Sequence, residues 1–170
     1  MKIRFSRPVM ACVTLLVVSV NFFVDRITKN IAVRYLKGRE PAVFFDRLAV
    51  LVYAENDGAF LSLGSGWNIY VKYVVLLIIP ILLCIFALVF LAFKEKKMYR
   101  IISGGCVIGG GLSNLIDRLF NNFTVIDFLN FGIGNLRTGV LNTADLSVTF
   151  GVIALVIFEN SSNRRKAAVV

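Results

Sequence analysis

The segment YVVLLIIPILLCIFALVFLAF, residues 73–93, contains 21 consecutive residues without a charged side chain. A helix that crosses the hydrocarbon core of a bilayer needs about 20 predominantly apolar residues, so this length and composition predict a membrane-spanning helix. Pro80 lies within the segment and predicts a kink, because its ring removes one backbone hydrogen bond from a helix. A chain with such a segment is expected to be an integral membrane protein.

The composition of the whole chain supports this interpretation. Hydrophobic residues make up 58% of the 170 residues, and the mean hydropathy of +0.79 is well above that of ordinary globular proteins. The net charge of +9 is concentrated at the ends of apolar runs, at Lys2, Arg4, Arg7, Lys94, Lys96, Lys97, Arg100, Arg164, Arg165 and Lys166. Such clusters are typical of cytoplasmic flanks of membrane helices, and the sequence has no soluble face for nucleic acid. No nucleic-acid partner is expected.

Three further apolar segments are long enough to be considered as spans, at about 9–24, 101–117 and 140–158. The first follows a basic start but lacks a small-residue cleavage pattern after Ser19, which predicts a retained helix rather than a removed signal peptide. The segment 101–117 is rich in glycine, which allows helices to approach closely in lipid. We therefore expect an all-α polytopic membrane protein with four transmembrane helices in a single domain, residues 1–170.

The positive-inside rule predicts the orientation of these helices. Both termini and the loop 94–100 are expected in the cytoplasm, where ten Lys and Arg and two acids give a net charge of +8. The segments 25–72 and 118–139 are expected on the outer side, where nine Lys and Arg and eight acids, counted with Asp117 and Asp145 at the adjoining helix ends, give +1. The outer residues 48–54 are rich in β-branched and aromatic types and could pair with 41–45 as a small extracytoplasmic β element.

Several chemistries are excluded because the chain contains no histidine. Ser-His-Asp, Cys-His and HExxH sites all require it. The three cysteines, Cys12, Cys84 and Cys106, are odd in number, lack CxxC spacing and lie within apolar runs, which argues against a disulfide framework or a metal site. We expect no metal and no cofactor, and a chemistry that uses carboxylates, amides and cations.

The predicted topology gathers on the outer side every polar cluster that the basic flanks do not explain. These residues are Asp25, Lys29, Asn56, Gly58, Asn114, Asp117, Arg118, Asp127, Asn142 and Asp145. A carboxylate near the centre of a membrane helix costs about 2.5–3.5 kcal/mol on insertion scales, and less near the interface, so Asp117 and Asp145 within or against apolar runs are candidates for function. Asn56 and Asn114 carry both donors and acceptors, which suits them to hold an extended peptide backbone.

Each candidate also has a structural interpretation. Asn142 and Asp145 could simply begin a helix, with Asn as the cap and Asp in the first turn. Asp127 is expected in a loop between helices, where a carboxylate is ordinarily solvated, although its apolar neighbours argue against simple exposure. The pair Asp25 and Lys29 lies four residues apart, so a helix that continues past the membrane would place them on one face as a supporting pair.

The outer helix end at Asp117 and Arg118 likewise allows two interpretations. It could be a plain interfacial anchor, or Arg118 could orient backbone carbonyls or substrate while Asp117 supports the local fold. Gly58 is expected to allow a turn or a close backbone approach.

Five strings of the sequence together resemble a known family. DRITK at 25–29, NDGAF at 56–60, GGGLSNLIDR at 109–118, VIDF at 125–128 and NTAD at 142–145 are similar to the ordered motifs of lipoprotein signal peptidase, or signal peptidase II. The resemblance implies a membrane aspartyl protease that removes the signal peptide from bacterial prolipoproteins, cutting before a diacylglyceryl-modified cysteine. It assigns the catalytic pair to Asp127 and Asp145.

The same resemblance implies further properties of the site and its surroundings. Substrate-binding residues would be Asn56, Gly58, Asn114, Arg118 and Asn142, and the partners would be lipidated prolipoproteins and membrane lipid. A monomer in the bacterial cytoplasmic membrane, with its site on the outer face, is expected. Two positions depart from the family pattern: Arg26 stands where glutamine is usual, and Glu55 where a basic residue is usual.

Two other functions are alternatives to a signal peptidase. A small proton- or ion-coupled transporter component should carry acids at the bilayer midplane, but the central parts of all four predicted helices lack charge. An inactive membrane scaffold would not need the intact pair of Asp127 and Asp145.

Overall fold

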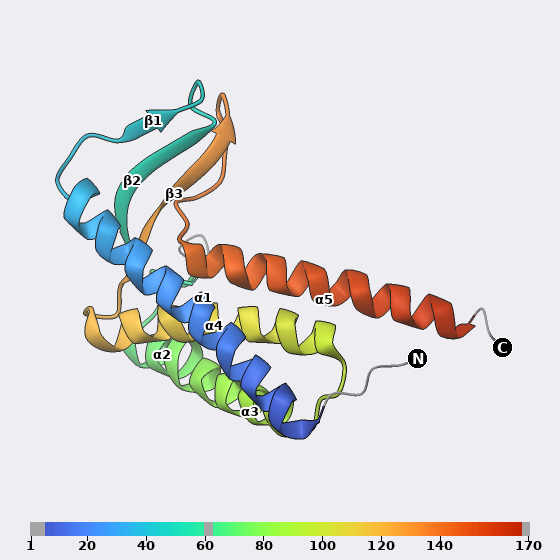
Figure 1. Cartoon of the computed structure of the whole chain (residues 1–170). Helices are drawn as coiled ribbons and strands as arrows, with labels where there is room; N and C mark the ends of the chain where they lie inside the picture. Colours follow the sequence, from blue (N-terminus) through green and yellow to red (C-terminus); the bar gives the residue numbers. More distant parts are fainter. Residues whose placement is uncertain (1–5, 60–62, 168–170) are drawn as a thin grey trace.

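The computed structural model describes residues 6–59 and 63–167 and consists of long helices with one small sheet at one end (Figure 1). The helices are α1 (Arg7–Leu36), α2 (Ile69–Tyr73), the π-helical η2 (Val74–Ile78), α3 (Ile79–Phe93), α4 (Met98–Phe120) and α5 (Thr143–Ala167). The strands are β1 (Ala42–Phe44), β2 (Ala49–Asn56), β3 (Val125–Ile133) and β4 (Leu136–Arg137).

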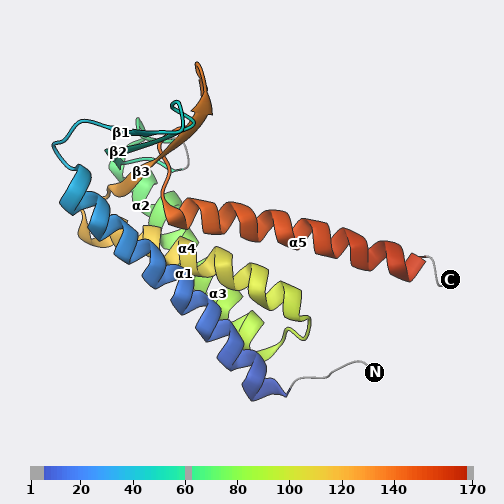
Figure 2. The same ribbon diagram turned by 45° about the horizontal axis from the view of Figure 1, so that its top comes forward.

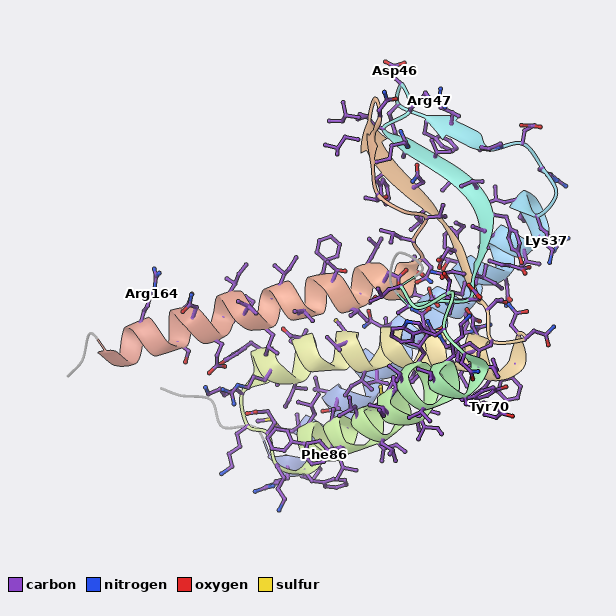
Figure 3. All side chains as sticks on the ribbon, turned by 180° about the vertical axis from the view of Figure 1, so that it is seen from behind. Lys37, Asp46, Arg47, Tyr70, Phe86 and Arg164 are labelled. Carbon is purple, nitrogen blue, oxygen red and sulfur yellow. The ribbon has the colours of Figure 1, made fainter. Side chains whose placement is uncertain are left out.

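Within residues 6–59 and 63–167, three helical segments are long and apolar enough to cross a membrane: Arg7–Leu36, Ile69–Phe93 and Thr143–Ser162. Their outward faces carry large apolar side chains, such as Phe86 on α3, which is 69% exposed and points away from the bundle (Figure 3). Lipid solvates such a surface and water does not. The prediction of a largely helical membrane protein with a small sheet is therefore confirmed.

Helix α4 differs from the other three in composition and position. Its glycines and its polar residues, among them Ser113 and Asn114, lower its hydropathy, and it is not among the three candidate spans. It packs against α1, α3 and α5 and thus lies at the centre of the bundle. A central helix exposes little surface to lipid and does not need an apolar face. The fourth span remains a prediction.

The helices are longer than their apolar runs predicted. Helix α1 continues from Val24 to Leu36, α2 begins at Ile69, and α4 runs from Met98 to Phe120 instead of 101–117. Hydropathy marks where a helix leaves hydrocarbon and not where its hydrogen bonds end. Conversely, α5 begins at Thr143 and not at residue 140, because residues before it pair with β3.

The predicted irregularity at Pro80 takes the form of a π-helical turn. The segment η2 ends directly before α3, and the amide of Ile79 donates to the carbonyl of Val74, five residues earlier. Pro80 then occupies the first turn of α3, where its missing N–H is tolerated. Residues 69–93 therefore form one continuous helix.

The sheet is antiparallel with the order β1-β2-β3-β4 and lies at one end of the helix bundle (Figure 2). Strands β1 and β2 occupy the segments predicted to pair. Strand β3 was not predicted, and the prediction of a loop around Asp127 is wrong. A short apolar run does not reveal its partner, because β2 lies about 70 residues earlier in the chain.

Glycines on α4 let two neighbouring helices approach its backbone. A Cβ atom at Gly109 would lie 2.5 Å from the carbonyl oxygen of Val18 on α1. A Cβ atom at Gly110 would lie 2.6 Å from the carbonyl oxygen of Ala144 on α5. This close approach, expected from the glycine-rich sequence, brings Asn114, one turn after Gly110, next to the start of α5.

The glycine contacts predict a pattern of stability changes. Gly109→Ala and Gly110→Ala should each destabilise the protein by about 1–3 kcal/mol, because the new methyl group meets a backbone atom that cannot move aside. Gly111→Ala is the matched control, since its Cβ would lie 3.5 Å from the sulfur of Cys84, an ordinary contact. Thermal unfolding in detergent measures the effect. Equal melting temperatures for all three variants would contradict this account of the packing.

Candidate active site

The candidate site forms where the end of β3 meets the start of α5. Leu129 and Leu141 exchange two backbone hydrogen bonds, each of 2.7 Å. This pairing carries the next residue, Asn142, to the side of Asp127. The two motifs that contain the predicted catalytic pair, VIDF at 125–128 and NTAD at 142–145, therefore meet through a backbone contact that the sequence alone does not reveal.

Asn142 contacts both carboxylates. Its side-chain amide donates to Asp127 Oδ1 at 2.6 Å. Its backbone N–H donates to Asp145 Oδ2 at 3.1 Å, while its Oδ1 accepts from the backbone N–H of Asp145 at 2.9 Å. The reciprocal pair of bonds is a capping box at the start of α5. The structural interpretation of Asp145 as part of a helix start is thus correct, and it does not exclude a chemical role.

Asp127 lies on β3 with only 2% of its surface exposed. It faces Ala54 of β2 across the sheet, so Asn56, two residues along β2, lies on the same face and donates to Asp127 Oδ2 at 3.1 Å. Burial and the negative charge of Asp145 together raise the pKa of Asp127 to about 6, against the lowering effect of the two asparagines. One carboxyl of the pair therefore holds a proton below about pH 6.

Asn114 connects Asp145 to the interior of the bundle. Its side-chain nitrogen donates to Asp145 Oδ1 at 3.0 Å. Its side-chain oxygen accepts from Lys29 Nζ at 2.7 Å and from the Asn142 amide at 3.1 Å. Every polar atom of the Asn114 side chain is therefore engaged.

A cluster of buried charges lies directly behind Asn114. Lys29 Nζ lies 2.7 Å from Asp25 Oδ2 and 2.7 Å from Asp117 Oδ2, and all three side chains are at most 1% exposed. Asp25 and Lys29 thus form the pair expected from their four-residue spacing. Asp25 Oδ1 also accepts from the hydroxyl of Thr143 at 2.7 Å and from the backbone N–H of Ala144 at 2.8 Å, which ties α1 to the start of α5.

Arg118 and Gly58 border the site on the sheet side. Arg118 Nη2 donates to the Gly58 carbonyl at 2.7 Å, and the Gly58 N–H donates to Asn56 Oδ1 at 3.0 Å. Arg118 thus contacts a backbone carbonyl, as one of its sequence interpretations required. A cavity of about 240 Å³ opens beside it, lined by both polar and apolar side chains, among them Ala59, Leu76, Pro80, Cys84, Asn114 and Asp145.

The amides predicted to bind substrate are occupied by the protein itself. Besides its bond to Asp127, Asn56 donates to the Ala59 carbonyl at 3.3 Å. Asn114 and Asn142 are likewise fully used within the site. In this arrangement the three amides hold the carboxylates, and their contact with a substrate remains a prediction.

Both departures from the family pattern face away from the carboxylate pair. Arg26 forms an ion pair with Asp117. Glu55 lies on the opposite face of β2 from Asn56, where its carboxylate accepts from Tyr53 at 2.6 Å and from Lys37 at 3.1 Å. Both side chains therefore serve the local structure.

The sequence interpretation missed Thr143 and Lys72. Thr143 lies within the NTAD motif, and its hydroxyl bonds Asp25. Lys72 is buried and pairs with Asp57 at 2.6 Å, which fastens the segment after β2 to α2; a lysine directly before the apolar run could have suggested such a partner. Phe60, the last residue of the NDGAF motif, lies outside the described residues. Trp67 is exposed and stacks over Gly64.

Comparison with known sequences gives consistent matches. The family model described as Signal peptidase (SPase) II matches residues 17–160. A lipoprotein signal peptidase of Borrelia duttonii (strain Ly) is 35% identical over 150 residues, which cover 85% of this chain and 88% of that protein. One of Borreliella afzelii (strain PKo) is 35% identical over 148 residues, with coverage of 84% and 86%.

The fold also has solved counterparts. A bacterial membrane enzyme determined by the in meso method at 2.3 Å resolution aligns with a TM-score of 0.75 and 25% identity, covering 88% of this chain and 90% of that one. A second such enzyme, at 1.9 Å resolution, aligns with a TM-score of 0.70 and 22% identity, covering 85% and 90%. With a family match over residues 17–160 and relatives 35% identical across most of both chains, this protein belongs to the signal peptidase II family.

Proposed function

We propose that this protein is an aspartic endopeptidase that removes signal peptides from lipoprotein precursors, with Asp127 and Asp145 as its catalytic pair. Membership of the family supports the activity. The single observation that supports the pair is that Asn142 donates a hydrogen bond to each of the two carboxylates, which keeps Asp127 and Asp145 on either side of one residue. We further propose that the cut precedes a diacylglyceryl-modified cysteine, as the family resemblance implies.

The chemistry requires one ionised and one protonated carboxyl group. Two buried carboxylates in contact with one partner do not both ionise readily, so they share a proton. We assign that proton to Asp127, whose pKa is raised to about 6. Asp145 is then the base: it accepts from the backbone N–H of Asn142 and from the side chain of Asn114, and Asn114 is itself bonded to the Lys29 ammonium group.

The reaction then proceeds in two steps. Asp145 takes a proton from a water molecule, whose oxygen attacks the scissile carbonyl carbon while Asp127 donates its proton to the carbonyl oxygen. In the second step Asp145 passes the proton to the leaving nitrogen, the C–N bond breaks, and the proton on the former carbonyl oxygen returns to Asp127. The protein's own groups thus account for every proton that moves.

Arg118 provides a place for the substrate backbone. Its Nε is buried and has no partner among residues 6–59 and 63–167, while its Nη2 holds the Gly58 carbonyl. A peptide carbonyl in the adjacent cavity would satisfy that donor. The apolar lining of the same cavity includes residues of α3, which would suit an apolar segment of a signal peptide.

The orientation in the membrane follows from the charges and the helix directions. We propose four spans, including α4, with the sheet and the site on the outer face of the bacterial cytoplasmic membrane. Lys37, Asp46 and Arg47 lie at the end of the molecule that carries the sheet, and Arg164 lies at the opposite end of α5 (Figure 3). A diacylated substrate would then reach a monomeric enzyme by lateral diffusion in the outer leaflet.

Substitution of either aspartate should abolish turnover. Asp127→Asn and Asp145→Asn keep the side-chain size but remove acid–base capacity, a change that typically costs about 10²–10⁴-fold in rate. Cleavage of a lipidated prolipoprotein by purified enzyme measures it, with an unlipidated form in parallel. Asp46→Asn, at the far tip of the sheet, is the matched carboxylate control. Wild-type turnover by either site variant would remove that residue from the mechanism.

The activity should fall as the pH rises through about 6. The raised pKa of Asp127 means that it keeps its proton below about 6 and loses it above, and the doubly ionised pair lacks an acid. The alkaline limb of kcat/KM reports this ionisation in the free enzyme. A kcat/KM that stays constant from about pH 5 to about pH 8 would contradict the proton assignment.

Thiol labelling tests the proposed topology. In a cysteine-free background, single cysteines replace the exposed residues Ser65, Lys96 and Asn135. A membrane-impermeant maleimide added to intact spheroplasts should label Ser65→Cys and Asn135→Cys and should spare Lys96→Cys until the membrane is opened. The reverse pattern would put the site on the cytoplasmic side.

A further inference from the structure

Lys29 is enclosed by protein groups and is too deeply buried to contact a substrate or a reacting atom directly. Its ammonium group carries three protons. One is donated to Asn114 Oδ1 at 2.7 Å, and the group lies 2.7 Å from carboxylate oxygens of Asp25 and Asp117. The side chain is fully buried. Any effect of Lys29 on the reaction must therefore be transmitted through Asn114, Asp25 or Asp117.

Of the three partners, only Asn114 bonds a member of the proposed catalytic pair. A carboxamide has an acceptor end and a donor end, and it can lie in two orientations that differ by a half-turn. Because an ammonium group only donates, the oxygen of Asn114 must face Lys29, and the nitrogen must then face Asp145. The reverse orientation would press the amide protons against the ammonium and the amide oxygen against a carboxylate oxygen.

We propose that Lys29 is a positioning residue for hydrolysis: it selects the orientation of Asn114, so that Asn114 donates to Asp145 and keeps Asp145 ionised as the base. This inference rests on the proposed function. Without Lys29, the Asn114 oxygen retains the bond from Asn142 at 3.1 Å as its remaining partner in the site. The Asn114 amide is then free to turn its oxygen towards a protonated Asp145, which cannot accept the proton of water.

A purely structural role for Lys29 predicts different behaviour and must be separated from this one. Replacement of Lys29 alone would leave two buried carboxylates short of a cation, which is strongly destabilising. The test therefore uses Asp25→Asn as the reference background, in which Asp117 still pairs with Arg26. In that background Lys29→Met removes the ammonium group and keeps an unbranched side chain.

The first measurement is the kinetics of cleavage of a lipidated prolipoprotein. Relative to Asp25→Asn, Asp25→Asn/Lys29→Met should lose kcat by about 100-fold, the scale expected when a catalytic group is misplaced by about 1 Å, while KM and the melting temperature stay close to the reference. Unchanged kcat in the folded double variant would overturn the proposal. Arg26→Gln is the matched control, because Arg26 also pairs with Asp117 but is not bonded to Asn114.

The second measurement asks whether the effect passes through Asn114. When Asn114→Leu is already present, Lys29→Met should lower kcat little further, since residues that act through one contact are not additive. An undiminished loss in that background would overturn the proposal. Should the Met variant fail to fold, Lys29→Arg keeps the charge beside Asp25 and Asp117 but places a longer planar group at Asn114, and kcat should fall without a loss of melting temperature.

A third measurement is independent of activity. In protein labelled with ¹⁵N-asparagine, the side-chain amide of Asn114 is identified by its disappearance in Asn114→Leu. Its resonance should shift between Asp25→Asn and Asp25→Asn/Lys29→Met, and an unmoved resonance would overturn the role of Lys29. If the wild-type protein cleaves no lipidated prolipoprotein, the proposed function fails, and this resonance alone decides whether Lys29 orients Asn114.

Discussion

The arrangement of this protein depends on the burial of Lys29 between Asp25 and Asp117. Charges taken out of water at a helix junction are stable only when each one is paired and hydrogen-bonded, and loss of one partner typically costs about 3–5 kcal/mol. Both aspartates also bond other elements. Asp25 Oδ1 holds the start of α5, and Asp117 Oδ2, the oxygen next to Lys29, accepts from the backbone N–H of Ile126 on β3 at 3.3 Å. One ammonium group therefore locks α1, α4, α5 and β3 into a single geometry.

The glycines of α4 make this junction possible. Polar side chains as short as Asp and Asn meet across helices only when the helix backbones come close, and Gly109 and Gly110 remove the methyl groups that would prevent it. The same feature explains why α4 resembles a membrane span least while it lies most centrally. Its role is to bring three other helices together, and its polar residues find partners there instead of lipid.

Asp145 shows that a structural role and a chemical role can require the same contacts. The capping box fixes the side chain of Asp145 at the first turn of α5, and the fixed side chain then presents its second oxygen to Asn114. Asn142, the capping residue, uses its amide for Asp127. A capped helix start is rigid because its backbone N–H groups are hydrogen-bonded. A side chain in such a turn is therefore well suited to keep its position during a reaction.

The sequence by itself determined the membrane class, the approximate position of the long helices, the pairing of β1 with β2 and the set of polar residues at the site. Apolar length, charge asymmetry and the five motifs are local properties, so they can be read without a fold. Only the tertiary structure decided that Asp127 lies on a strand, that Asn142 bridges the two carboxylates and that Arg26 and Glu55 point elsewhere. These contacts join residues far apart in the chain, through a backbone pairing at Leu129 and Leu141 and a buried ammonium group at Lys29, and no local pattern specifies which distant partner a buried polar group will find.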